Sequence, residues 1–140
     1  MSAPRRKPEA AVEREVLRAV GATPGVLLLK NEVGFGHPRA VRYALQDALK
    51  AFGPAVVATA LSVLDRHTIR WGLGTGSPDL VGAVDGRAGG LELKAADGVV
   101  SDEQRTWHAA ARRRGVFVGV VRSAEEAQAA IQRWRAGEVE

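Results

Sequence analysis

Residues 80–94 read LVGAVDGRAGGLELK and contain the clearest structural pattern of this chain. Leu80 to Val84 is rich in strand-forming residues, and Asp85-Gly86-Arg87 is typical of a hairpin turn. The segment from Ala88 to Ala96 then predicts the returning strand. The stretch therefore predicts two neighbouring antiparallel strands.

The returning strand has one apolar and one charged face. Successive side chains of a strand alternate between faces, so Glu92 and Lys94 share one face while Leu91 and Leu93 point to the other. The apolar face of such a strand packs on the core, and its other face carries the carboxylate and the ammonium group.

A glycine-rich turn precedes the first strand of the pair. Gly74 and Gly76 supply backbone freedom, and Pro78 restricts Ser77 to extended angles. The backbone that leads into the strand at Asp79 is therefore expected to be rigid. We expect Asp79 and Glu92 to come from neighbouring strands.

Two carboxylates and one ammonium in this arrangement suit phosphoryl transfer. Carboxylate oxygens are hard ligands for Mg²⁺ or Mn²⁺, and Lys94 is suited to contact a phosphate oxygen or to orient the attacking water. Two like charges about 4 Å apart repel by roughly 4 kcal/mol at an effective dielectric of 20, so Asp79 and Glu92 imply a cation between them. The structural alternative is a turn at Pro78-Asp79 and a solvated edge pair at Glu92 and Lys94.

The ordered set of Pro78-Asp79, Glu92-x-Lys94 and a downstream Gln104 resembles the VRR-Nuc branch of the PD-(D/E)XK nuclease superfamily. The likeness runs from about Glu9 to about Ile131. It implies a magnesium-dependent nuclease with Asp79 and Glu92 as metal ligands, Lys94 as the catalytic lysine and Gln104 as a supporting residue. It also implies DNA, and branched DNA in particular, as the partner of a homodimer.

The resembling family places a glutamate on the first helix, which this sequence predicts from Glu9 to Val20. Valines recur every four residues along it and mark its buried stripe (Val12, Val16 and Val20). Glu9 and Glu13 lie beside that stripe, whereas Glu15 is rotated away. We favour Glu9 as a metal ligand, with Glu13 the close alternative. Both glutamates also suit the positive end of the helix without any role in catalysis.

The remaining elements give an α/β fold with a restriction-endonuclease-like core, a mixed central sheet flanked by helices. Residues 1–8 form a basic disordered tail and 9–136 a single nuclease domain, with a helical insertion at about 36–66. The other predicted elements are a strand at 26–30, a loop at 31–38, helices at 39–52 and 54–64, a strand at 68–72, a helix from Ser101, a strand at 116–121 and a helix at 124–135.

Several residues have two readings. Gln104 also fits a capping box with Ser101, the expected N-cap of its helix. Asn31 suits either a turn or a DNA contact, and His108 is expected to lie on a helix face without a role. The insertion suits dimerisation or gripping of the substrate, and equally a helical pair packed on the core.

Composition agrees with a single-domain DNA-binding enzyme. The chain has 140 residues, 46% of them hydrophobic, which suffices for one core. Its net charge of +4 favours a polyanionic partner, and the basic clusters at 5–7 and 112–114 are candidates for phosphate contacts or, in the second case, helix capping. The absence of cysteine excludes disulfides and thiolate zinc sites, and the three histidines have no metal-ligand spacing.

We therefore expect a metal-dependent, structure-specific DNA endonuclease, a homodimer that resolves four-way junctions. The alternatives are a flap, nicking or restriction-type nuclease, and a non-catalytic DNA-binding module with the same fold. No apolar stretch is long enough to span a membrane, and the expected location is the cytoplasm of a bacterial or phage-infected cell.

Overall fold

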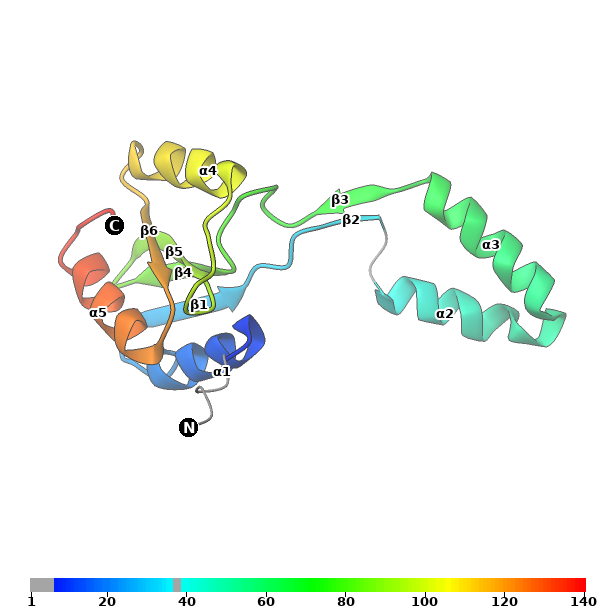
Figure 1. The fold of residues 1–140 in the computed structure, drawn as a ribbon, viewed down its shortest axis with the longest axis horizontal. Helices are drawn as coiled ribbons and strands as arrows, with labels where there is room; N and C mark the ends of the chain where they lie inside the picture. Colours follow the sequence, from blue (N-terminus) through cyan, green and yellow to red (C-terminus); the bar gives the residue numbers. More distant parts are fainter. Residues whose placement is uncertain (1–6, 37–38) are drawn as a thin grey trace. The chain divides into compact units, whose positions relative to one another are not determined.

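The computed structural model describes residues 7–36 and 39–140, which fall into two units (Figure 1). We call residues up to Asn31 together with Thr75–Glu140 the α/β unit, and Glu32–Gly74 the helical unit. The predicted basic tail lies outside the described residues as far as residue 6, as does His37.

A four-stranded mixed sheet forms the centre of the α/β unit. Its strands follow the order β1 (Val26–Lys30), β4 (Leu80–Val84), β5 (Arg87–Leu93) and β6 (Phe117–Val121). β1 pairs antiparallel with β4 and β4 with β5, whereas β5 and β6 run parallel. The predicted α/β class with a mixed sheet is confirmed.

The hydrophobic core lies between the sheet and two helices, α1 (Glu9–Val20) and α5 (Ala124–Arg135). The predicted valine stripe of α1 is buried, and Trp134 of α5 stacks on Phe117 with ring centroids 5.1 Å apart. A side chain added at Gly89 would meet the Trp134 ring at 2.5 Å, so this glycine lets α5 approach the sheet. Each large apolar side chain buried here stabilises the fold by about 1.5–3 kcal/mol.

Helix α4 (Asp102–Arg112) lies on the other side of the sheet (Figure 1). It begins with the predicted capping box, in which Ser101 accepts a hydrogen bond from the Gln104 N–H and Gln104 accepts one from the Ser101 N–H. Its one buried residue is His108. The charged face of β5 is therefore covered by a helix.

The hairpin between β4 and β5 has the predicted turn. Asp85 and Gly86 both adopt positive φ, 47° and 79°, as the favoured two-residue hairpin turns require. The returning strand ends at Leu93, earlier than the predicted Ala96. Lys94 nevertheless stays tied to the sheet, because its N–H donates to the Val121 carbonyl at 3.0 Å.

The helical unit consists of a two-stranded ribbon and a pair of helices. β2 (Gly34–Gly36) pairs antiparallel with β3 (Ile69–Trp71). The prediction of a loop throughout 31–38 was wrong at β2, because pairing with a strand more than thirty residues away is invisible in a turn-rich local sequence.

The helices of this unit have slightly different bounds from those predicted. α2 (Arg39–Leu49) gives way to a 3-10 turn at Lys50–Phe52, and α3 (Pro54–Arg66) is two residues longer than expected. Gly53 separates them at φ 93°, a conformation that disfavours other residues. Arg42 and Asp65 form an ion pair that joins the two helices.

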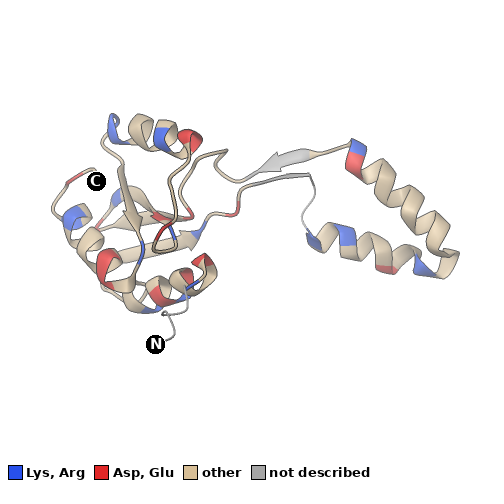
Figure 2. Ribbon diagram, in the orientation of Figure 1, with Lys and Arg blue, Asp and Glu red and all other residues tan. Residues whose placement is uncertain are grey.

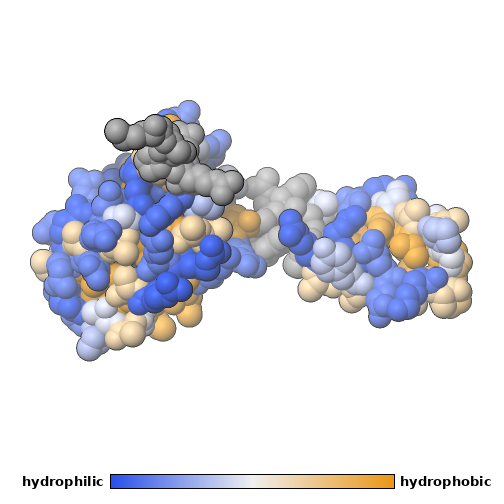
Figure 3. Space-filling view, turned by 60° about the horizontal axis from the view of Figure 1, so that its bottom comes forward, coloured by the Kyte–Doolittle hydropathy of each residue, from blue (hydrophilic) through white to orange (hydrophobic). Residues whose placement is uncertain are grey.

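Neither α2 nor α3, both described over their full length, contains a buried residue. Figure 2 shows charge at only a few positions of this pair, and Figure 3 shows hydrophobic side chains on its surface. Phe52 and Tyr43 are 69% and 65% exposed. None of the described helices is long and apolar enough to cross a membrane.

Candidate active site

The register of β4 and β5 brings the two predicted carboxylates together. Leu80 pairs with Leu91, so one further step of the same register sets Asp79 opposite Glu92. Directly opposed residues of an antiparallel pair have Cβ atoms about 4.5–5.5 Å apart. The site therefore forms where β4 begins and β5 ends.

Asp79 is half-buried and anchored to the strand beside it. Its Oδ2 accepts a hydrogen bond from the Leu93 N–H at 2.8 Å. Burial raises the pKa of Asp79 to about 6, against the opposing effect of the Leu93 bond and with a further rise caused by the Glu92 charge. The charges of the two carboxylates thus repel each other.

Glu92 is fully buried among polar partners. Its Oε1 accepts hydrogen bonds from Lys94 Nζ at 2.8 Å and from Gln104 Nε2 at 2.5 Å. Burial acts to raise the pKa of Glu92, but the neighbouring His108 and Lys94 outweigh it, so the pKa lies below its ordinary value. Glu92 is therefore held as a carboxylate.

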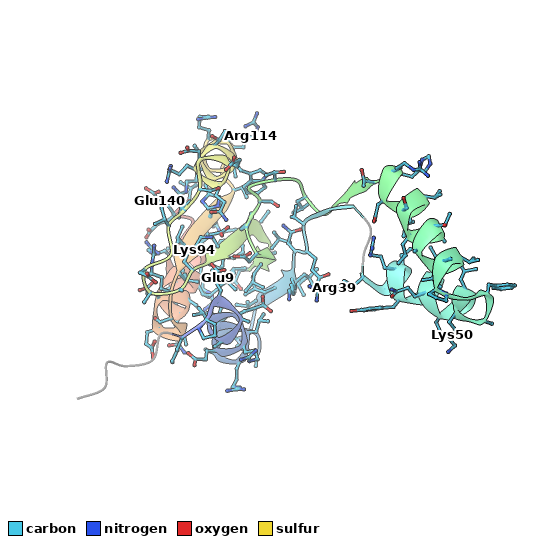
Figure 4. The ribbon with its side chains drawn as sticks, turned by 45° about the vertical axis from the view of Figure 1, so that its right-hand side comes forward. Glu9, Arg39, Lys50, Lys94, Arg114 and Glu140 are labelled. Carbon is cyan, nitrogen blue, oxygen red and sulfur yellow. The ribbon has the colours of Figure 1, made fainter. Side chains whose placement is uncertain are left out.

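Lys94 lies between Glu92 and the first turn of α1 (Figure 4). Its side chain is 12% exposed, and Nζ is 3.6 Å from Glu9 Oε1. Burial acts to lower its pKa, but the bond to Glu92 and the charges of Glu92, Glu9 and Asp79 raise it above the ordinary value. Lys94 is thus a firmly charged ammonium, not a general base.

The structure separates the two candidate glutamates of α1. Glu9 reaches the site through Lys94, whereas Glu13 lies 3.3 Å from Lys30 at the end of β1. Glu15, expected to be solvated, forms an exposed pair with Lys7. Of the three, only Glu9 contacts a residue of the Asp79, Glu92 and Lys94 group through an ion pair within the described part of the chain.

Gln104 caps its helix and contacts Glu92 at once. Its Oε1 closes the capping box by accepting from the Ser101 N–H at 2.8 Å, while its Nε2 donates to Glu92. The two readings of the sequence are therefore compatible, because an amide side chain offers an acceptor and a donor at opposite corners.

His108 was expected to lie on a helix face without a role, but it is buried next to Glu92. One turn after Gln104 on α4, it places Nε2 at 3.6 Å from Glu92 Oε2, longer than a hydrogen bond. These two buried atoms have no hydrogen-bond partner within the described part of the chain. The signal was the spacing of four residues from Gln104, which puts both side chains on one helix face.

The donor set suits Mg²⁺ or Mn²⁺, although among the described residues no three His, Cys, Asp or Glu side chains are already arranged around a common metal position. Mg²⁺ is commonly bound by one or two carboxylates, with waters and substrate phosphates completing the shell. Two facing carboxylates, one with a buried oxygen lacking a partner, match that requirement.

The basic cluster at the end of α4 serves the fold. Arg112 donates to the Val118 carbonyl at 2.6 Å and pairs with Glu140, and Arg114 donates to the Ala110 carbonyl at 2.9 Å. The capping alternative therefore applies to Arg114, which bonds a carbonyl in the last turn of α4, whereas Arg112 joins the helix to β6.

The model of the family described as the VRR-NUC domain matches residues 34–125, more than half of the chain. An α/β protein with paired carboxylates and a largely buried lysine at the end of a strand is thus a nuclease-type protein that acts on DNA. The chain belongs to the VRR-NUC domain family. The match includes Asp79, Glu92, Lys94 and Gln104 but begins after α1. No curated protein and no solved structure shows a significant match.

Proposed function

We propose that the chain is a metal-dependent, structure-specific DNA endonuclease whose α/β unit is a PD-(D/E)XK core. The proposal rests on the β4–β5 register, whose extension by one residue sets Asp79 opposite Glu92, and on the bond of Lys94 to Glu92. The mixed sheet with helices on both faces supports the assignment of the core.

Asp79 and Glu92 would hold the metal ion, with Glu9 as a further ligand. When bound, Mg²⁺ or Mn²⁺ neutralises charge on the scissile phosphate and lowers the pKa of a coordinated water. Burial, and to a lesser extent the charge of Glu92, raises the pKa of Asp79, and this supports the role because a cation would offset both effects.

Lys94 would bind a phosphate oxygen or orient the attacking water. Its raised pKa keeps it charged, so it acts by electrostatic stabilisation. Gln104 fixes the Oε1 of Glu92, which leaves Oε2 as the oxygen without a hydrogen bond. The main contribution of the protein would thus be to position the charged groups of Lys94 and Glu92 around the phosphate and the metal ion.

We further propose that the enzyme is a homodimer that resolves four-way junctions. One small unit with one site must pair to cut two strands symmetrically. The exposed apolar side chains of α2 and α3 support a self-association surface, since patches of this kind commonly mark interfaces. Sedimentation of the wild type and of Val56→Asp, with Ser62→Asp as control on the same helix, tests this step. Monomeric wild type, or an unchanged dimer in Val56→Asp, would count against it.

The substrate is decided by cleavage of end-labelled four-way junction, flap, duplex and single-stranded DNA with Mg²⁺ or Mn²⁺. Paired symmetrical cuts in the junction support a resolving enzyme. Cuts confined to flaps or duplex keep the nuclease and discard junction resolution. DNA binding without cleavage under either ion would favour the non-catalytic module.

A further inference from the structure

Asn31 lies at the end of β1 and is bonded to the turn that carries Asp79. Its Nδ2 donates to Ser77 Oγ at 2.8 Å and to the Pro78 carbonyl at 2.9 Å. Its backbone N–H donates to the Asp79 carbonyl at 2.7 Å. Three consecutive residues ending in a proposed metal ligand are thus held by one side chain and its own backbone.

The orientation of this amide is fixed by chemistry. The Pro78 carbonyl can only accept a hydrogen bond, so the group facing it must be the NH₂ of Asn31 and not the oxygen. Both hydrogens of Nδ2 are then directed at Ser77 and Pro78. The predicted alternative of a DNA contact through this NH₂ is thereby disfavoured.

The turn itself is packed tightly on the site. A side chain added at Gly90 would come within 2.5 Å of Pro78 Cγ, so the proline ring lies directly over β5. Ser77 is 8% exposed. Pro78, which directly precedes Asp79, therefore packs on the strand that carries Glu92. A movement of this turn would displace Asp79 relative to Glu92.

Asn31 is the last residue of the α/β unit before the chain enters the helical unit. The α/β unit is interrupted after Asn31 and resumes at Thr75. Asp79 is thus the first predicted site residue after a 43-residue excursion, counted from Glu32 to Gly74. The bonds from Asn31 close that excursion at its base.

We propose that Asn31 is a positioning residue, which fixes Asp79 opposite Glu92 and thereby sets the metal affinity of the site. The metal part rests on the proposed function; the positioning of Asp79 does not. Mutation of a residue that orients a metal ligand typically lowers metal affinity about 10- to 100-fold.

Arg135 offers a matched control at the opposite end of the same two strands. It donates to the Pro24 carbonyl at 2.7 Å and to Asp85 Oδ2 at 2.7 Å, and so ties the start of β1 to the end of β4. Asn31→Leu and Arg135→Leu each remove a side-chain clamp between these segments. Only the first clamp is next to Asp79.

The first readout is amide hydrogen exchange of the metal-free protein. The Leu93 N–H donates to Asp79 Oδ2, whereas the adjacent Lys94 N–H donates to Val121. In Asn31→Leu we expect Leu93 to exchange about tenfold faster relative to Lys94, and in Arg135→Leu we expect that ratio to stay at the wild-type value. Ser77→Ala, which leaves the Pro78 bond, should give a smaller rise and serves if Asn31→Leu does not fold.

The second readout is the Mg²⁺ concentration that half-stabilises the protein in thermal unfolding. It should rise about 10- to 100-fold in Asn31→Leu and stay unchanged in Arg135→Leu. An unchanged Leu93 to Lys94 ratio in Asn31→Leu, or equal changes in both variants, would overturn the proposal. If wild type shows no response to Mg²⁺, the proposed function fails, while the exchange ratio still decides the role of Asn31.

Discussion

Gln104 joins the first turn of α4 to the buried carboxylate of Glu92 on β5. The Nε2 to Oε1 distance is 2.5 Å, and the same amide caps the helix through the Ser101 N–H. Loss of the Gln104 side chain would remove one bond of the cap and one bond to Glu92 together. Local helix chemistry and the geometry of the site therefore depend on one side chain.

The two tasks of Gln104 can be separated by mutation. Ser101→Ala removes only the cap bond to the Gln104 N–H and should cost about 1 kcal/mol of unfolding free energy, with cleavage unchanged. Gln104→Ala should cost at least as much stability and also reduce the cleavage rate about 10- to 100-fold, because Glu92 loses a partner. Chemical denaturation and single-turnover cleavage measure both. Equal cleavage by the two variants would show that Gln104 is only a cap.

Glu9 and Glu13 form a matched pair on α1. Glu9→Gln should lower cleavage at limiting Mg²⁺ by about tenfold or more, because Glu9 faces Lys94. Glu13→Gln should change little, since Glu13 pairs with the exposed Lys30 and such pairs contribute about 0–1 kcal/mol. The reverse ranking of the two variants would make Glu13 the site residue.

Asp79 should make metal-free stability depend on pH. Burial raises its folded-state pKa from 3.8 to about 6, so the protonated form stabilises the fold. This contribution is present below about pH 3.8 and is lost as the pH rises through 6. Denaturant unfolding between pH 4 and 7.5, compared with Asp79→Asn, isolates it. Parallel pH curves for the two proteins would refute the raised pKa.

The same proton should compete with Mg²⁺. Below about pH 6 the half-saturating Mg²⁺ concentration of wild type should rise by up to tenfold per pH unit, because the ligand must be deprotonated to bind. Above pH 7 it should level off. Calorimetric titration at several pH values checks this, and a flat profile between pH 5 and 7 would exclude Asp79 as the competing group.

The Glu92 and Lys94 pair should be strongly coupled in the metal-free protein. Lys94→Met leaves the fully buried Glu92 without its cation and should cost about 3–5 kcal/mol of unfolding free energy. The double variant with Glu92→Gln should recover part of that loss. Strict additivity in the double-mutant cycle would mean that the two charges do not interact.

Much of the α/β unit could be predicted because local chemistry and tertiary structure agree there. The Asp85-Gly86 turn, the valine stripe of α1 and the Ser101 cap each specify their own element. The alternation of apolar and charged residues in β5 likewise predicted that Glu92 lies on the face opposite to Leu91 and Leu93. Asp79, Glu92, Lys94 and Gln104, selected from their order in the sequence, lie close together in the structure, and their role stays a prediction.

The remaining features depend on contacts between distant segments. The pairing of β2 with β3 needs residues far apart in sequence, and the bonds of Asn31 to the Ser77-Pro78 turn have no local signature. The burial of His108 required knowing that α4 covers the charged face of β5. The ion pairs that place Glu9 beside Lys94 and Glu13 beside Lys30 also join segments far apart in the sequence.

The assignment of Asp79 to the active site is tested by the rate of Mg²⁺-dependent cleavage of a labelled four-way junction by wild type, Asp79→Asn and Asp85→Asn. Asp85 is a matched aspartate in the hairpin turn, bonded to Arg135 and away from the site. We predict cleavage by wild type and Asp85→Asn, and a loss of about 10²- to 10³-fold or more in Asp79→Asn. Cleavage by Asp79→Asn at the wild-type rate would contradict the assignment of the site.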